Sequence, residues 1–258
     1  MSAVISASLC TGCGLCAKVC PSRAVTLQKT AAVNAERCLS CGHCGAVCPA
    51  GAVSSAGEKE FSVFDPEGSA VEQLLQGKRS VREFKEDTVS REILSDLVRY
   101  AEMAPSSRNT RGRKYFIVTG NRAAPAGIFL PLLRIFNRKR AASLSSLKNL
   151  FSAMKKSYDA GGHPVLCGAP AVICIASPKS NMQGKDDCVC AEQYLMLYAE
   201  SIGLASCING YTQIAHKAAE TFCGVPENYR IEAAVMLGYP RYAYRRYVRY
   251  TEDVSWIE

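Results

Sequence analysis

Two closely similar runs of cysteines lie within the first fifty residues of this chain. Both have the spacing C-x₂-C-x₂-C-x₃-C-P, and each cysteine of the second run lies 28 residues after its counterpart in the first. The first run consists of Cys10, Cys13, Cys16 and Cys20, and the second of Cys38, Cys41, Cys44 and Cys48. Gly14 and Gly42 keep the same register, so the segment is an internal repeat.

This spacing predicts two 4Fe–4S clusters. Three closely spaced cysteines can bind three corners of one cluster, and the fourth, which precedes a proline, reaches the other cluster. We therefore assign Cys10, Cys13, Cys16 and Cys48 to one cluster, and Cys38, Cys41, Cys44 and Cys20 to the second. Zinc sites use paired C-x₂-C or mixed Cys/His ligands, and a disulfide scaffold needs an oxidising compartment. Neither alternative fits this pattern.

The remaining composition indicates one further domain. A chain of 258 residues that is 48% hydrophobic can bury an ordinary core beyond the cluster module. The other six of its 14 cysteines have no ligand spacing, and we expect them to be buried thiols in a reducing cytoplasm. Residues 1–9 do not form a signal peptide, and no apolar run reaches membrane-spanning length. We predict a soluble cytoplasmic protein with no membrane span.

The positive charge is concentrated in one segment. Residues 122–158 contain eight basic side chains and no acidic one, so the remaining 23 basic and 23 acidic side chains cancel. Such a segment could bind an anionic substrate, an acidic protein, a membrane surface or nucleic acid. No motif with interleaved aromatic residues supports nucleic acid. We interpret residues 122–166 as a basic lid insert whose charged face is solvated, and expect no nucleic-acid partner.

The rest of the chain predicts alternating helices and strands. A polar linker over 54–60 separates a domain at 1–57 from a second domain at 66–258. We expect helices over 67–77, over 186–204, from the N-cap Ser90 to Ala101, and from Thr212 onward, with one or two more in 122–160. We expect strands over 114–119, 169–176 and 231–237. Alternation favours an α/β or α+β sandwich. No G-x-G-x-x-G follows a strand, which argues against a dinucleotide-binding Rossmann domain.

Residues from about 70 to 258 resemble the FMN-dependent nitroreductase family, and residues 5–56 resemble bacterial two-cluster ferredoxins. The nitroreductase motifs occur in the family's order. They are Lys78-Arg79-Ser80-Val81-Arg82 (similar to R-R-S-x-R), Pro105-Ser106-Ser107-Arg108-Asn109 (A-P-S-S-x-N), the central helix at 191–207, Cys207-Ile208-Asn209-Gly210, and Gly238-Tyr239-Pro240 followed by Arg245, Arg246 and Arg249.

The resemblance implies a role for each motif. Lys78, Arg79, Ser80 and Arg82 would grip the flavin phosphate and ribityl chain. Pro105, Ser106, Ser107 and Asn109 would reach the flavin of a partner subunit in a homodimer. The stretch Cys207–Gly210 would present backbone amides to flavin N5, from Asn209 or Gly210. One of Arg245, Arg246 and Arg249 would meet the phosphate. The implied fold is α+β: a small ferredoxin-like module, then a sandwich domain with a mostly antiparallel central sheet.

Several positions depart from the family pattern. Lys78 replaces the first arginine, and Arg111 stands where a glutamine is common. The basic insert falls where the family shapes the substrate face, so the substrate cannot be carried over. We expect His43 to be exposed to solvent and Tyr211 to pack in the core.

The predicted function follows from these parts. Clusters pass single electrons, and FMN converts them into a two-electron reduction. We expect an enzyme that takes electrons from an external low-potential donor such as ferredoxin, with NAD(P)H as a secondary donor. Its acceptor would be a nitroaromatic, a quinone, an activated alkene or a similar small molecule. The alternative is an electron-transfer or redox-sensing protein that passes electrons to a protein partner.

Overall fold

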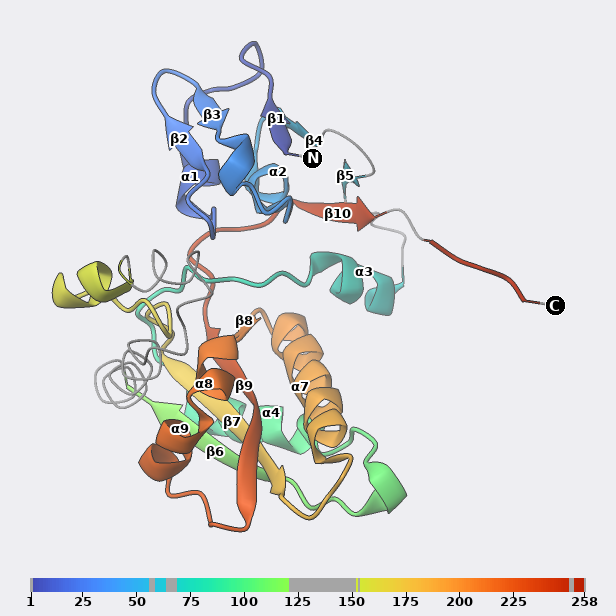
Figure 1. Cartoon of the computed structure of the whole chain (residues 1–258). Coiled ribbons are helices and arrows are strands. Elements are labelled where there is room, and N and C mark those ends of the chain that lie inside the picture. The colour runs from blue at the N-terminus through green and yellow to red at the C-terminus, as the bar shows by residue number, and fades with distance from the viewer. Residues whose placement is uncertain are drawn as a thin grey trace. The chain divides into compact units, whose positions relative to one another are not determined.

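A computed structural model describes residues 2–55, 59–63, 69–120, 152, 154–250 and 253–257. The predicted basic insert therefore lies mostly outside the described residues. The chain forms two compact units, Met1–Arg79 with Tyr242–Glu258, and Ser80–Arg241 (Figure 1). In the part of the chain that is described, no helix is long and apolar enough to cross a membrane.

The internal repeat organises the amino-terminal unit. Its elements are β1 (Ala3–Ile5), α1 (Leu15–Lys18), β2 (Val25–Leu27), β3 (Ala31–Val33), the 3₁₀ turn η1 (Ala35–Arg37), α2 (His43–Val47) and β4 (Val53–Ser55). Strand β1 pairs antiparallel with β4, and β2 with β3. Because β3 and β4 are the repeat counterparts of β1 and β2, each antiparallel pair joins a strand from one copy to a strand of the other. The two cysteine runs are thereby brought together.

A left-handed glycine precedes each short helix of this unit. Gly14 (φ 74°) precedes α1, and Gly42 (φ 76°) precedes α2. A residue with a Cβ adopts this conformation only at a cost, so glycine lets the chain turn sharply between the second and third cysteine of each run. Close packing of the loop adds a constraint at Gly12, where a Cβ would lie 2.7 Å from the carbonyl oxygen of Lys29.

The carboxy-terminal segment belongs to this unit. Strand β10 (Arg246–Tyr250) pairs antiparallel with β5 (Lys59–Val63), and α3 (Ala70–Gly77) begins at a capping box made by Ser69 and Glu72. The sequence placed residues 242–258 in the second domain, whereas strand pairing groups them with the amino-terminal one. Pairing between segments this far apart in the chain leaves no signal in the spacing of residues.

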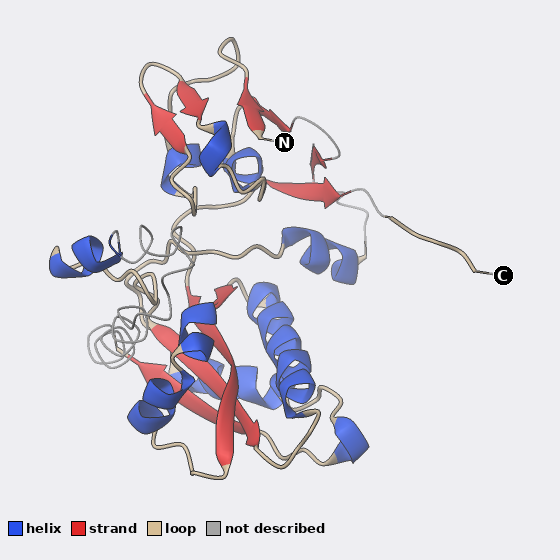
Figure 2. Ribbon diagram, in the orientation of Figure 1, coloured by secondary structure: helices blue, strands red, loops and turns tan. Residues whose placement is uncertain are grey.

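The second unit is built on a four-stranded sheet in the order β6-β7-β9-β8, with every neighbouring pair antiparallel (Figure 2). The strands are β6 (Lys114–Thr119), β7 (Ala171–Pro178), β8 (Ala205–Ile208) and β9 (Tyr229–Gly238). This sheet confirms the α+β prediction with a mostly antiparallel centre. Strand β7 is buried along seven of its eight residues, as its continuous apolar run predicted.

Helices cover both faces of that sheet. The helices are α4 (Arg91–Ala101), α7 (Gly184–Ser201), α8 (Gly210–Ile214) and α9 (His216–Cys223). On one face, Ile173 and Ile175 of β7 pack with Leu97 of α4 and Leu195 of α7. Helices α8 and α9 pack against β9 as well. Alternate residues of β7 therefore face two apolar layers, which explains why its sequence does not alternate with polar residues.

Local signals predicted most helices and strands of the second unit. Ser90 caps α4 by accepting a hydrogen bond from the Ile93 amide at 3.3 Å, as predicted. The cysteine expectation is wrong at Cys190, which is exposed, because it lies on the outer face of α7. Cys167 and Cys223 are half-buried, and Cys174, Cys188 and Cys207 are buried.

Candidate cluster and flavin sites

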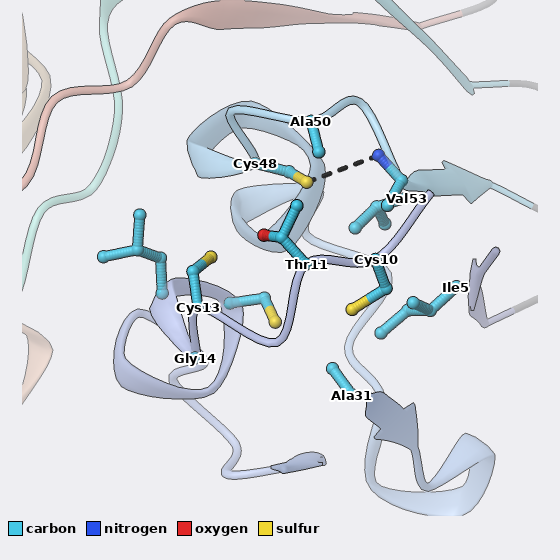
Figure 3. Close-up of a pocket in the computed structure, with 12 residues that line it drawn as sticks. Ile5, Cys10, Thr11, Cys13, Gly14, Ala31, Cys48, Ala50 and Val53 are labelled. Carbon is cyan, nitrogen blue, oxygen red and sulfur yellow. Dashed lines mark hydrogen bonds between the residues drawn. The ribbon is translucent and has the colours of Figure 1, made fainter. Parts of the chain in front are cut away.

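Two hollows in the amino-terminal unit are each lined by four cysteines. Cys10, Cys13, Cys16 and Cys48 line the first, together with the apolar side chains of Ile5, Ala31 and Val53 (Figure 3). Cys20, Cys38, Cys41 and Cys44 line the second. The fold thus brings Cys48 to the first cysteine run and Cys20 to the second, which is the crossed arrangement that the spacing predicted.

The donor set suits clusters better than single ions. Across the described residues, no three His, Cys, Asp or Glu side chains are grouped as one metal ion requires. A 4Fe–4S cluster binds its four thiolates on four separate irons, so its ligands lie farther apart than those of zinc. Burial raises the pKa of the Cys44 thiol to about 12.

Backbone amides donate hydrogen bonds to the sulfurs of the two crossing cysteines, Cys20 and Cys48, each of which lies in the hollow of the other run. The Ala24 amide lies 3.2 Å from Cys20 Sγ, and the Ala52 amide lies 3.3 Å from Cys48 Sγ, the contact dashed in Figure 3. These two contacts are related by the 28-residue repeat. Amide donors stabilise thiolates and tune cluster potentials, so both sites have the outer ligand environment that a cluster uses.

The two sites also differ. Ser22 Oγ lies 3.6 Å from Cys20 Sγ, whereas the repeat counterpart of Ser22 is Ala50, which has no hydroxyl. His43 lines the second hollow and is only 7% exposed. The expectation that His43 is exposed is wrong, because the Tyr244 ring lies edge-on at 5.7 Å between centroids.

In the second unit, the segment after Arg79 lies along the end of β8. The Val81 amide donates to the Ser206 carbonyl at 3.2 Å, and Ser80 and Ser206 form a parallel bridge. This pairing brings the motif with Ser80 and Arg82 next to the motif over 207–210, although the two lie more than 120 residues apart in the sequence.

Asn209 is occupied by structural hydrogen bonds. Its amide donates to the Ala234 carbonyl at 2.7 Å, and its side chain caps α8 by accepting from the Thr212 amide at 2.8 Å. The side chain also donates to the Val165 carbonyl at 2.7 Å. Gly210 is the first residue of α8, where an amide has no acceptor within its own helix, and a Cβ there would meet nothing within 4 Å. Of the two amides predicted for flavin N5, the geometry therefore favours that of Gly210.

The Pro105–Asn109 motif lies in a different part of the second unit. The Ser107 amide donates to Asp187 Oδ1 at 2.7 Å, which fixes the motif to the first turn of α7. Arg108, Asn109 and Arg111 all have positive φ, near 50°. Three left-handed residues other than glycine within four positions are costly, so this loop shape must be held by its surroundings.

Arg113 supports that loop. Its side chain is 1% exposed and donates to Glu102 and to the carbonyls of Ala104, Pro105 and Asp187. Sequence reasoning missed both Arg113 and Asp187, because neither belongs to a motif and the contacts of Asp187 with Arg113 and Ser107 join residues more than 70 positions apart.

Five of the cations predicted for the flavin phosphate belong to the amino-terminal unit, namely Lys78, Arg79, Arg245, Arg246 and Arg249. Arg79 Nη1 donates to the Gln76 carbonyl at 2.8 Å. The Arg245 amide donates to the Ala46 carbonyl at 3.0 Å, and Arg246 Nη1 donates to the Cys48 carbonyl. The side chain of Arg249 lies outside the described part. Arg82 belongs to the second unit.

Comparison with known proteins gives a consistent result. The Nitroreductase family matches residues 75–239, and a 4Fe-4S dicluster domain matches residues 9–52. A nitrobenzene nitroreductase of Ectopseudomonas oleovorans is 24% identical over 203 residues, covering 67% of this chain and 88% of that protein. A nitroreductase with bound FMN from Desulfitobacterium hafniense shares the fold with a TM-score of 0.59 at 21% identity, over 74% of this chain and all of that one. A Mycobacterium smegmatis nitroreductase in complex with NADPH has a TM-score of 0.51 at 24% identity, over 67% and 88% of the two chains.

Proposed function

Since this chain belongs to the nitroreductase family and is an oxidoreductase with a 4Fe-4S dicluster domain ahead of its catalytic domain, we propose that two clusters deliver electrons to FMN. The substrate would be a small organic acceptor, such as a nitroaromatic, a quinone or an activated alkene, which bound FMN would reduce. FMN supplies the conversion from one-electron delivery to two-electron reduction. The observation that carries this proposal is the pair of hollows, each lined by four cysteines, with Cys48 beside the first run and Cys20 beside the second.

The residues of the second unit support FMN as the acceptor of those electrons. Arg82 offers a bidentate cation for a phosphate, and its Nη1 lies 3.0 Å from the Ser80 carbonyl within the same motif. Gly210 offers an amide at a helix start, in open space where a flavin ring edge can approach. A flavin-bound relative of the same fold is consistent with this assignment.

The Pro105–Asn109 motif supports a homodimer. Ser107 is bonded to α7, which lies with α4 on one face of the sheet. Gly210 is the first residue of α8, and its capping neighbour Asn209 contacts Met236 on the other face. The motif is thus separated by the sheet from the site of its own chain, so it serves the flavin of a second subunit. Light scattering should find a dimer, and Ser107→Trp should lower FMN retention. A monomer loaded with FMN would contradict the assignment.

We propose that the electrons come from an external low-potential donor. The two units are joined at two points of one chain, at 79/80 and at 241/242, so electron delivery needs no diffusive encounter between separate proteins. The NADPH complex of a relative makes nicotinamide the rival donor. A cytoplasmic location stays a prediction from the free thiols.

The first test is the iron and FMN content of the protein. Anaerobically purified protein should contain eight irons and one FMN per chain, and four irons or tightly bound zinc would overturn the two-cluster assignment. Cys20→Ser should then damage the second cluster and abolish turnover with reduced ferredoxin, while dithionite still reduces the flavin. Cys190→Ser is the matched control, because this thiol is exposed and lines neither hollow. If Cys20→Ser keeps full ferredoxin-driven turnover, or if NADPH drives wild type and variant equally, the relay is wrong.

A further inference from the structure

The loops that follow the two crossing cysteines are held in similar ways. After Cys20, Arg37 Nη2 donates to the Ser22 carbonyl at 3.2 Å. After Cys48, Arg246 Nη1 donates to the carbonyl of Cys48 itself. In each case an arginine donates to a backbone oxygen within two residues of the crossing ligand. The two arginines come from very different places in the sequence.

The repeat explains why the second arginine has to come from elsewhere. Arg37 lies in the second copy, one residue before Cys38, and its counterpart 28 residues earlier is Leu9, whose side chain cannot donate a hydrogen bond. The first copy therefore has no arginine of its own at this position. Arg246, 198 residues beyond Cys48, takes over the task.

Contacts on both sides of Arg246 hold it in place. The preceding amide, that of Arg245, donates to the Ala46 carbonyl at 3.0 Å in the helix that leads to Cys48. Arg246 is the first residue of β10 and is paired with Val63 of β5. Its Nη2 would lie 3.1 Å from a Cβ at Gly51, so the guanidinium rests directly on the turn after the crossing cysteine. Val248, two residues further, is buried.

We propose that Arg246 is a positioning residue of the first cluster, the one bound by Cys10, Cys13, Cys16 and Cys48. This inference rests on the proposed cluster ligands. The guanidinium fixes the backbone of Cys48 and brings a positive charge to the residue that supplies the crossing thiolate. Hydrogen bonds and positive charge around a cluster favour its reduced form, so Arg246 raises the reduction potential of the first cluster. On this assignment Arg246 is not the ligand of the FMN phosphate.

The test uses the full-length holoprotein and cluster-selective backgrounds. In Cys41→Ser only the first cluster should remain intact, and in Cys13→Ser only the second. Redox titration followed by EPR gives the midpoint potential of the remaining cluster. Arg246→Ala should shift that potential to a more negative value in the Cys41→Ser background and leave it unchanged in the Cys13→Ser background. Arg245→Ala is the matched control, because Arg245 is the exposed neighbouring arginine and should shift neither.

The other outcomes are decisive as well. Loss of four irons in Arg246→Ala, with FMN retained, supports the assignment. A smaller shift in Arg246→Lys, which keeps the charge but not the fork of donors, also supports it. Unchanged potentials and iron content in Arg246→Ala overturn it, and so does loss of FMN with both clusters intact. Loss of all iron and FMN in both Arg246→Ala and Arg246→Lys overturns a local role. Wild-type protein without a 4Fe–4S signal refutes the proposed function instead.

Discussion

Among the described arginines of the second unit, Arg113 should be the most costly to replace. Its guanidinium donates to Ala104 O at 2.9 Å, Asp187 O at 3.0 Å, Pro105 O at 3.2 Å and Glu102 Oε1 at 3.2 Å, and its side chain is 1% exposed. Arg113→Met keeps most of the apolar stem but removes every donor. Three carbonyl oxygens at the base of the Pro105–Asn109 loop then lose their partner.

The size of the effect follows from these contacts. An unsatisfied buried acceptor costs about 1–3 kcal/mol, and removal of one partner of a buried charge pair costs about 3–5 kcal/mol. The contacts share one side chain, so their costs do not add, and Glu102 can regain water because its side chain is 31% exposed. We expect the free energy of unfolding of the second unit to fall by about 3–5 kcal/mol.

The assay is urea unfolding of the FMN-loaded protein, followed by the release of flavin fluorescence. Arg111→Met is the control, since Arg111 is exposed and its side chain donates to Asn109 within the same loop, and it should change stability by no more than about 0.5 kcal/mol. The FMN dissociation constant should also rise in Arg113→Met, because the loop loses its support. A loss of stability below about 1 kcal/mol would refute the reasoning, since that is the value of one ordinary hydrogen bond.

Three further outcomes follow from single positions. Ser22→Ala should lower the reduction potential of the cluster that includes Cys20, and Ala50→Ser should raise the reduction potential of the other cluster. If voltammetry shows no such opposite shifts, the hydroxyl does not have this role. Burial raises the pKa of Glu192 to about 7, so the folded carboxyl keeps a proton that the unfolded one releases. Stability should therefore fall by about 3 kcal/mol as pH rises from about 4.5 to 7, and Glu192→Gln should flatten this slope in urea titrations; equal slopes would count against it. Gly238→Ala should destabilise the second unit by about 1–3 kcal/mol in the same titration, because its Cβ would lie 2.6 Å from a side-chain carbon of Pro170; an unchanged midpoint would show that the site can relax.

The sequence alone was informative wherever the chemistry is encoded in spacing. The cysteine runs predicted both which thiols gather and that Cys20 and Cys48 cross over, since a proline and a three-residue gap leave the fourth thiol no other direction. The N-cap at Ser90 and the strand over 114–119 were equally readable, because capping and strand periodicity depend on residues within a few positions.

Only the tertiary structure decided the features that depend on contacts between distant segments. Tyr244 of the tail buries His43, and Arg246 of the tail reaches Cys48. No periodicity connects such positions, because their proximity arises from the pairing of β10 with β5. The distinction between Asn209 and Gly210 has the same origin. Both residues carry an amide in the same motif, but the Asn209 amide donates its hydrogen bond to the Ala234 carbonyl of β9. The sequence does not say that β9 will lie beside this motif.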